Sequence, residues 1–271
     1  ALIGYLRGGR SGEGNGSSPS QPYRARVHVL GDIVDAEPTY VSGPRSSYTD
    51  PGYSSFAGGA AATRTKVVYQ GANDGMLHAF NAGTGAEMWA YVPGALINTP
   101  LSTTYPSTSS LVGLTQQSLF QHRFYVDGTP TATDVDLLHT LANQPTPPAP
   151  SWATVLVGSL AKGGRGYYAL NITDPTAASD AAVGAKVMWE FPNATLSTPN
   201  NIGYTYGTPL NVKTKAAGWV TLVTSGYNNG SDTGGDGMGH LYVLNIATGA
   251  VIADLSTGVG TSANPSGLAK I

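Results

Sequence analysis

The chain has 271 residues, with 36 glycines, 18 prolines and no cysteine, and charged residues make up only 11% of it. Its formal net charge is −2 and it contains no basic run, which excludes a surface that tracks nucleic-acid phosphates. Disulfides and thiolate metal sites are excluded, and no apolar stretch reaches the roughly 18 residues needed to cross a bilayer. The frequent glycines and prolines predict many short strands joined by turns.

The first 64 residues hold one strand candidate between irregular segments. Residues 1–6 are a short apolar segment, and the Gly- and Ser-rich residues 8–22 indicate flexible coil. We expect a strand within residues 27–41, around Pro38, and a long insertion at 42–64. Long loops on a rigid scaffold are where binding sites usually lie.

From residue 67 onward, one unit occurs three times. The predicted strands are 67–69, 76–80 and 87–92 in the first copy, 155–157, 167–170 and 187–191 in the second, and 221–224, 241–244 and 251–255 in the third. In each copy an asparagine directly follows the second of these strands: Asn81, Asn171 and Asn245. Three such turns in register indicate a repeated supersecondary unit.

A further strand candidate that contains a proline precedes each copy. These candidates are residues 27–41 around Pro38, 124–137 around Pro130 and 204–213 around Pro209. Proline has no amide hydrogen to donate, so it belongs at an edge, at a bulge or at the first residue of a strand. We therefore place these candidates innermost in each unit, beside a central channel.

Four strands per repeat predict an all-β fold, a β-propeller of about three four-stranded blades plus the start of a fourth. The middle strands are apolar on consecutive residues, as expected for sheets packed on both faces, whereas a β-sandwich would alternate more cleanly. The expected boundaries are an N-terminal segment and linker at 1–25, blades at 26–93, 122–192 and 203–257, and the start of the next blade at 258–271. Long loops at 94–121 and 138–151 separate the blades. Because three blades cannot close a ring, we expect a longer polypeptide with exposed apolar faces on the terminal blades.

Residues 228–237 are the one loop that combines many oxygen ligands with glycine. Asn228, Asp232 and Asp236 are weak candidates for a metal site, because calcium takes six to eight oxygen ligands. Their spacing differs from that of an EF-hand, and a polar hairpin loop is the simpler interpretation. For Asp127, Asp134 and Asp136 we expect solvated or strand-capping roles.

No catalytic residues are predicted. The five histidines do not cluster in sequence, and His78 and His240 fall on strands, where a hydrogen-bonded structural role is expected. Nucleophile elbows, zinc-protease motifs and phosphate-binding glycine loops are absent. Trp89 and Trp189 occupy equivalent positions in two copies and are expected to dock neighbouring blades.

Several segments resemble one known family in the family's own order: residues 2–14, 30–41, 67–93, 124–135 and 155–175. They are similar to the C-terminal propeller domain of the PilY/PilC proteins, tip-associated adhesins and biogenesis factors of type IV pili in Gram-negative bacteria. The resemblance covers nearly the whole chain.

The resemblance implies a non-enzymatic protein of the pilus tip or cell surface, exported through the periplasm and outer membrane, that supports pilus biogenesis and adhesion. It implies minor pilins of the tip complex as partners, and a host or surface receptor as a further one. The family's calcium site is an acidic loop expected in the blade after Ile271, so no cofactor is assigned to any position of this chain.

Two alternatives remain open at this stage. The Asp-Gly, Thr-Gly and Trp positions of the first repeat also resemble the pyrroloquinoline-quinone dehydrogenases. The second repeat replaces Asn-Asp-Gly with residues 162–166 and the third lacks the tryptophan, which favours shared architecture over shared chemistry. The other alternative is a carbohydrate- or protein-binding surface propeller unrelated to pili.

Overall fold

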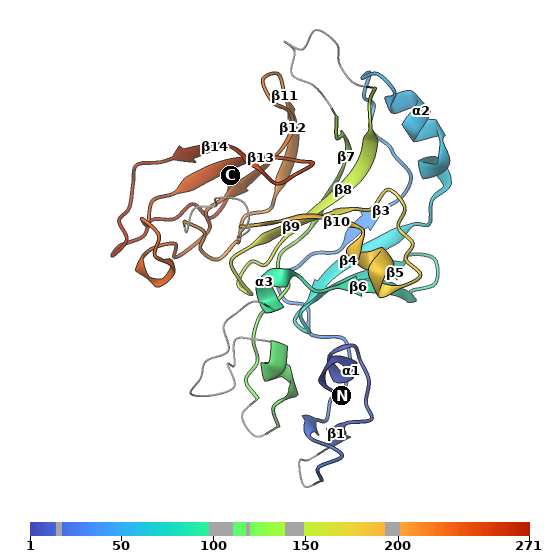
Figure 1. The fold of residues 1–271 in the computed structure, drawn as a ribbon, viewed down its shortest axis with the longest axis vertical. Helices are drawn as coiled ribbons and strands as arrows, with labels where there is room; N and C mark the ends of the chain where they lie inside the picture. The colour runs from blue at the N-terminus through green and yellow to red at the C-terminus, as the bar shows by residue number, and fades with distance from the viewer. Residues whose placement is uncertain (15–17, 98–110, 118–119, 139–148, 193–200) are drawn as a thin grey trace.

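A computed structural model of the chain describes residues 1–14, 18–97, 111–117, 120–138, 149–192 and 201–271. Three four-stranded antiparallel sheets, each built from consecutive strands, dominate it (Figure 1). Blade 1 contains β3 (Thr39–Val41), β4 (Val67–Ala72), β5 (Met76–Asn81) and β6 (Glu87–Tyr91). Blade 2 contains β7 (Thr131–Asp136), β8 (Trp152–Ser159), β9 (Tyr167–Asn171) and β10 (Val187–Phe191). Blade 3 contains β11 (Leu210–Thr214), β12 (Gly218–Thr224), β13 (His240–Asn245) and β14 (Val251–Ser256).

The three sheets fan out from their first strands. Strands β3, β7 and β11 each form one edge of their sheet, and β7 contacts both β3 and β11. The sheets therefore surround a common axis instead of stacking as two layers, and the predicted β-propeller architecture is confirmed. The three blades span an arc and leave the ring open (Figure 1). Beyond β14, Leu268 forms an antiparallel bridge with Gly226.

Each innermost strand begins one residue after its proline, so the prolines lie outside the strands. The strand candidates 27–41, 124–137 and 204–213 are confirmed as the first strands of the three sheets, but each strand is shorter than its range. The strands start at Thr39, Thr131 and Leu210, directly after Pro38, Pro130 and Pro209. A proline cannot contribute an amide to the ladder, so pairing starts only after it.

The prolines and the threonines that follow them also join one blade to the next. The Thr39 hydroxyl donates to the carbonyl oxygen of Pro130 (2.5 Å), and the Thr131 hydroxyl donates to that of Pro209 (3.0 Å). Two equivalent hydrogen bonds thus connect the inner strands of successive blades. Blade 3 has Leu210 at the corresponding position, and that side chain is 48% exposed.

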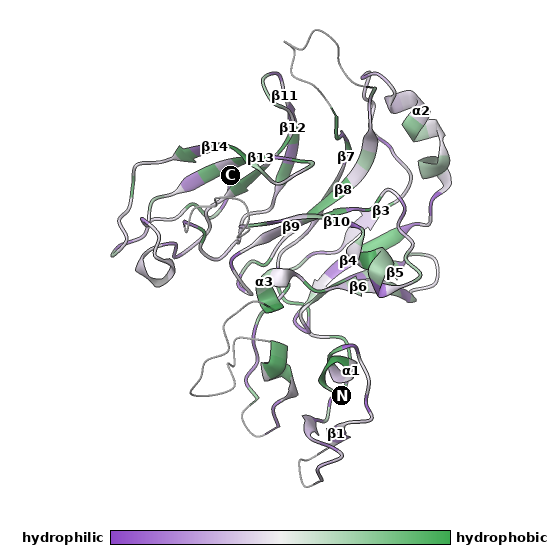
Figure 2. Cartoon of the chain, in the orientation of Figure 1, coloured by the Kyte–Doolittle hydropathy of each residue, from purple (hydrophilic) through white to green (hydrophobic). Residues whose placement is uncertain are grey.

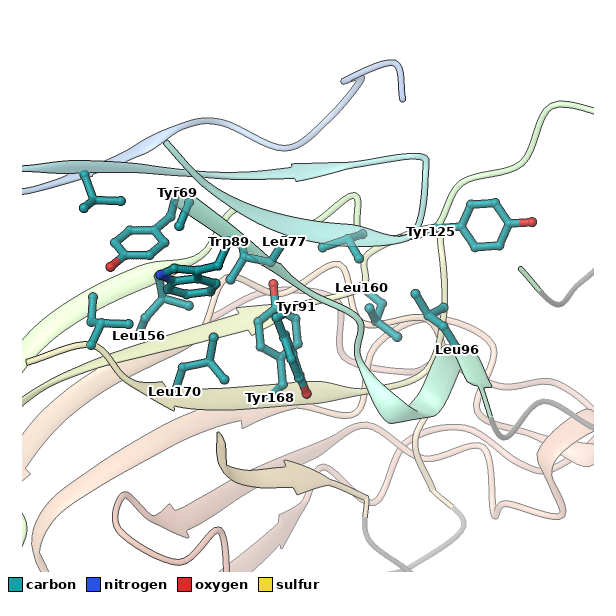
Figure 3. Close-up of a cluster of buried hydrophobic side chains, with 14 of the residues drawn as sticks. Tyr69, Leu77, Trp89, Tyr91, Leu96, Tyr125, Leu156, Leu160, Tyr168 and Leu170 are labelled. Atoms are coloured by element: carbon teal, nitrogen blue, oxygen red, sulfur yellow. The ribbon is translucent and has the colours of Figure 1, made fainter. Parts of the chain in front are cut away.

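The core lies between the broad faces of neighbouring blades. Hydrophobic stretches follow strands such as β4 and β8 (Figure 2), and seven of the eight residues of β8 are buried. Figure 3 shows how blades 1 and 2 meet: the Tyr91 ring of blade 1 lies against Tyr168 of blade 2, with centroids 5.4 Å apart, and Trp89 lies beside Tyr69 within blade 1. A second core joins blades 2 and 3, and contains Trp189, Phe191, Trp219, Val223, Tyr242 and Leu244.

One tryptophan in blade 1 and one in blade 2 each fasten their blade to the Asn turn of the next blade. Trp89 Nε1 donates to the carbonyl oxygen of Pro175 (2.7 Å), and Trp189 Nε1 donates to that of Ile246 (2.8 Å). Gly249 has φ +71°, and a Cβ there would come within 2.7 Å of the Trp189 ring, so glycine is required both for the turn and for the contact. The predicted docking role of both tryptophans is confirmed.

Short regular elements occur in the described part of the first 26 residues. They form α1 (Leu2–Leu6) and a two-stranded parallel pair, β1 (Glu13–Gly14) with β2 (Tyr23–Arg24). Within 8–22 only Glu13–Gly14 belong to a strand, and the other described residues lie in turns and irregular segments, in line with the expected coil. An ion pair between Glu13 and Arg26 (2.7 Å) links this segment to the residues that follow β2. A short helix, α3 (Gly94–Ile97), and a 3-10 helix, η2 (Leu111–Thr115), follow blade 1.

The insertion at 42–64 forms a strap that links blade 1 to blades 2 and 3. It contains α2 (Tyr53–Gly58) and the 3-10 helix η1 (Ala60–Thr63). The Tyr53 hydroxyl donates to Asp134 Oδ2 (2.9 Å), and Asp50 forms an ion pair with Lys213. The Tyr48 ring lies 5.8 Å from Trp152 and 5.3 Å from Trp219, so aromatic contacts complete the link. In blade 2, α4 (Asp180–Gly184) precedes β10.

The docking tryptophans yield the first prediction. Trp189→Ala should lower the free energy of unfolding by about 3–5 kcal/mol, because it removes a buried ring and leaves a cavity between blades. Trp189→Phe keeps most of the ring and removes one hydrogen bond, so it should cost about 1 kcal/mol from that bond plus the lost ring area. Urea denaturation followed by circular dichroism measures both. Equal losses for the two variants would contradict the docking role.

Candidate functional site

The predicted metal loop, residues 228–237, connects β12 to β13 and contains the 3-10 helix η3 (Ser231–Thr233). The Asp236 carboxylate accepts hydrogen bonds from the Met238 amide (2.8 Å) and from Asn201 Nδ2 (3.2 Å). Asn228 adopts the left-handed conformation (φ 57°), and the side chain of Asp232 lies outside the described part of the chain. Among the described residues, no three His, Asp or Glu side chains gather closely enough to hold a metal ion. The metal site at Asn228, Asp232 and Asp236 stays a prediction, as does calcium after Ile271.

Asp236 belongs to a different arrangement, in which a histidine lies between two carboxylates. His240 Nε2 is 3.1 Å from Asp236 Oδ2, and His240 Nδ1 is 2.6 Å from Asp254 Oδ1 on the neighbouring strand β14. The imidazole stacks on Tyr242 with an interplanar angle of 8° and is 4% exposed. We call this the blade 3 clasp.

Blade 1 contains the same arrangement. His78 Nε2 lies 3.1 Å from both oxygens of Asp74, and His78 Nδ1 lies 2.6 Å from Glu87 Oε1 on β6. The imidazole stacks on Phe80 with an interplanar angle of 16° and is also 4% exposed. Asp74 additionally accepts a hydrogen bond from the Gly31 amide (2.8 Å), which ties the segment before β3 to this blade 1 clasp.

A shared sequence pattern encodes both clasps: Asp-Gly-Met-x-His-x-aromatic, at residues 74–80 and 236–242. The aspartate ends the turn, the histidine follows four residues later on the strand, and the second carboxylate comes from the adjacent strand opposite the aromatic residue. The pattern lies two residues closer to Asn81 than to Asn245. Aligning the two repeats on their Asn turns therefore leaves the two copies of the pattern out of register. The expected structural role of both histidines is confirmed, since each ring nitrogen has a carboxylate partner.

The carboxylates determine the charge of the blade 1 clasp. Burial alone would lower the pKa of His78, but the hydrogen bonds and negative charges of Asp74 and Glu87 outweigh it and raise the pKa above its usual value. The imidazole between two carboxylates holds the β4–β5 turn, β5 and β6 together. The clasp therefore binds parts of one blade and leaves no ring nitrogen available for general base catalysis.

Asp127 is a buried carboxylate at the entry to blade 2. It is 1% exposed, its Oδ1 accepts from the Asp35 amide (3.0 Å), and its Oδ2 has no hydrogen-bond partner among the described residues. Burial, with a smaller contribution from the Asp35 charge, raises the pKa of Asp127 to about 6. The expectation that Asp127 is solvated was wrong, because the entry segments of blades 1 and 2 close over it.

Asp134 and Asp136 both have structural partners. Asp134 accepts from the hydroxyls of Thr154 (2.6 Å) and Tyr53 (2.9 Å), so it is buried and not solvated. Asp136 Oδ1 accepts from the amides of Ser151 (2.7 Å) and Leu138 (3.2 Å) just after β7 ends. The strand-capping role is thus confirmed for Asp136.

Fold and side-chain arrangement together define a β-propeller domain whose polar clusters fasten strands and blades. The family model described as the PilY1 beta-propeller domain matches residues 30–270. The chain therefore belongs to the PilY1 β-propeller domain family.

Named relatives agree with this assignment. The chain is 36% identical over 253 residues to a type IV pilus biogenesis factor PilY1 homolog of Xylella fastidiosa, which covers 91% of this chain and 18% of that protein. It is 30% identical over 277 residues to the type IV pilus biogenesis factor PilY1 of Pseudomonas aeruginosa strain PAK, covering 99% of this chain and 20% of that protein. The chain thus spans about a fifth of the length of these relatives.

A solved structure is also similar. The crystal structure of the Pseudomonas aeruginosa PilY1 C-terminal domain matches with a TM-score of 0.54 and 30% sequence identity, covering 80% of this chain and 35% of that one. The predicted relationship to the pilus-associated propellers is confirmed at the level of family and fold.

The blade 1 clasp predicts a pH-dependent contribution to stability. Because the pKa of His78 is raised on folding, the contribution is fully present below the unfolded pKa, about 6.5, and is lost as the pH rises through the folded value. His78→Gln should therefore cost more at pH 6 than at pH 9, with a difference of about 1–2 kcal/mol. Urea denaturation at both pH values measures it. His28→Gln, an exposed histidine, serves as the control, and an equal cost at both pH values would contradict the clasp.

Asp127 predicts the same direction of pH dependence, but here the substitution should stabilise the fold. Its raised pKa means that the folded state loses stability as the pH rises from about 4 through 6. Asp127→Asn removes the buried charge and retains an oxygen for the Asp35 amide, so it should raise stability at pH 8 by about 1–3 kcal/mol. The gain should shrink at pH 4. Thermal melting at the two pH values tests this, and a variant that is less stable at pH 8 would show that the charge is compensated.

Proposed function

We propose that this chain is the propeller part of a non-enzymatic type IV pilus biogenesis factor, acting at the pilus tip or cell surface and contributing to adhesion. The observation that carries the proposal is the family match over residues 30–270, together with relatives that are named as pilus biogenesis factors. Its proposed partners are the minor pilins of the tip complex, with a host or surface receptor as a further one. Export through the periplasm and outer membrane is part of the proposal.

The side chains described above favour a scaffold over an enzyme. Each clasp histidine is held by two carboxylates, Asp134 and Asp136 have hydroxyl or amide donors, and the docking tryptophans are buried between blades. A quinone-dependent dehydrogenase is the less favoured alternative, because the third repeat has Ala253 opposite Val243, where the first two repeats have Trp89 and Trp189. No helix in the described residues combines the length and apolar character that a membrane span requires.

A genetic test addresses the biological role. Deleting the codons for residues 30–270 in frame should remove surface pili, because assembly would lose the propeller part. Sheared pilin is quantified by immunoblot, with whole-cell pilin as the expression control and the intact gene supplied in trans as the rescue. Normal piliation of a strain that still secretes the shortened protein would contradict the role in biogenesis.

A biochemical test addresses the partners. The immobilised chain should retain minor pilins, and an unrelated propeller of similar net charge should not. The enzymatic alternative is tested in the same preparation by measuring dye-linked alcohol oxidation after adding pyrroloquinoline quinone and calcium. Retention without turnover is the expected result; turnover, or equal retention by the unrelated propeller, would contradict the proposal.

A further inference from the structure

The N-terminal lobe, formed by residues 1–14, 18–26, 111–117 and 120–123, lies beside blade 1 (Figure 1). Its centre is Arg26, which forms an ion pair with Glu13 (2.7 Å) and places its guanidinium 3.7 Å from the centre of the Tyr5 ring. The Tyr5 hydroxyl donates to the Leu114 carbonyl (3.2 Å), joining the first residues of the chain to η2. These contacts make the lobe a built unit.

A cavity of about 180 Å³ lies where this lobe meets blade 1. Arg24 and Phe120 line it from the lobe, and Asp32, Asn73 and Asp74 line it from the blade 1 side. Junctions between structural units are preferred places for small-ligand sites. An engineered apolar cavity of about 150 Å³ holds a benzene ring, so this cavity has room for one six-membered ring with small substituents.

The charges around the cavity favour an anion. Both of its aspartates already have cationic or hydrogen-bonding partners: Asp74 is held by His78, and Asp32 Oδ2 lies 2.7 Å from His122 Nε2. Arg26 is neutralised by Glu13, whereas Arg24 makes no ion pair with any carboxylate of the described residues. Arg24 is half-buried, so its positive charge is only partly screened by water.

Arg24 is also oriented. Its guanidinium lies 3.8 Å from the centre of the Phe120 ring, and its Nε donates to the Leu114 carbonyl oxygen (3.4 Å). Stacking and one hydrogen bond hold the group in a single plane, so little side-chain entropy is lost when it binds a partner. A planar guanidinium matches the two oxygens of a carboxylate.

We propose that this cavity binds a carboxylate-bearing ligand the size of one sugar ring, with Arg24 as the residue that recognises the carboxylate. The apolar side chains Leu6, Leu114 and Phe120 line the cavity and offer apolar surface to such a ring. His28, which is exposed and has no hydrogen-bond partner among the described residues, is available to its hydroxyls. This site lies apart from the faces between blades and goes beyond the proposed role in pilus biogenesis.

Isothermal titration calorimetry of the whole chain tests the proposal with galacturonate, galactose and sulfate as probes. Galacturonate should bind, and galactose, which has the same ring without the carboxylate, should bind about ten- to a hundredfold more weakly because it lacks the charge-assisted hydrogen bonds. Absence of galacturonate binding would overturn the proposal. Sulfate binding as tight as that of galacturonate would overturn the assignment of a sugar-sized ligand.

Two substitutions and a control locate the site. Arg24→Gln should weaken galacturonate binding by the same factor of about ten to a hundred, and Arg24→Lys should weaken it less, since lysine keeps the charge and loses the planar fork. Arg7→Gln is the matched control, because Arg7 is exposed and pairs with Asp180 away from the cavity. Thermal melting reports whether each variant folds. Unchanged affinity in either folded Arg24 variant would overturn the role of this residue.

Discussion

The structure depends on one constraint: the broad faces of each blade must be buried by neighbouring blades, because the middle strands carry apolar residues on both sides. Strand β8 shows this most clearly, with seven consecutive buried residues. Burial of flat faces is not directional, so it does not by itself define how neighbouring blades align. The indole hydrogen bonds of Trp89 and Trp189, and the hydroxyl hydrogen bonds of Thr39 and Thr131, supply that alignment at the outer and inner strands respectively.

The same constraint explains where polar groups lie. A buried polar group is tolerated when it has hydrogen-bond partners, and the buried imidazoles of both clasps meet this condition, because each ring nitrogen faces a carboxylate. Asp127 does not meet it, since one of its oxygens has no partner among the described residues. Side chains that already pair with one another between strands and blades have few contacts left for a ligand. Arg24 in the N-terminal lobe makes no ion pair within the described part of the chain, so it is the side chain most suited to binding one.

Local patterns made much of the fold predictable. Asn81, Asn171 and Asn245 mark turns whose side-chain oxygens bind the following amides, and a local bond of this kind appears directly in sequence. Long-range contacts were not predictable in this way. The contact between Asp74 and His78 is local, but Glu87 reaches His78 only through the register of β5 and β6. The Glu13–Arg26 ion pair and the hydrogen bond from Tyr53 to Asp134 depend on how distant segments pack. The cavity beside Arg24 likewise exists only once residues 24, 74 and 120 meet.

Blade 3 shows how the repeat varies within the constraint. Ala253 pairs with Val243, as Trp89 pairs with Ala79 and Trp189 with Ala169, and the register shift beside it is retained. The backbone of the docking strand is therefore preserved while the indole is lost. Any surface that packs against β14 meets Ile252 and Leu255, which are 46% and 54% exposed, and receives no directional hydrogen bond from a tryptophan there. In a repeat protein, stability is a sum of interfaces between neighbours, so a neighbour packed on this face would lack the indole hydrogen bond that strengthens the interfaces at Trp89 and Trp189.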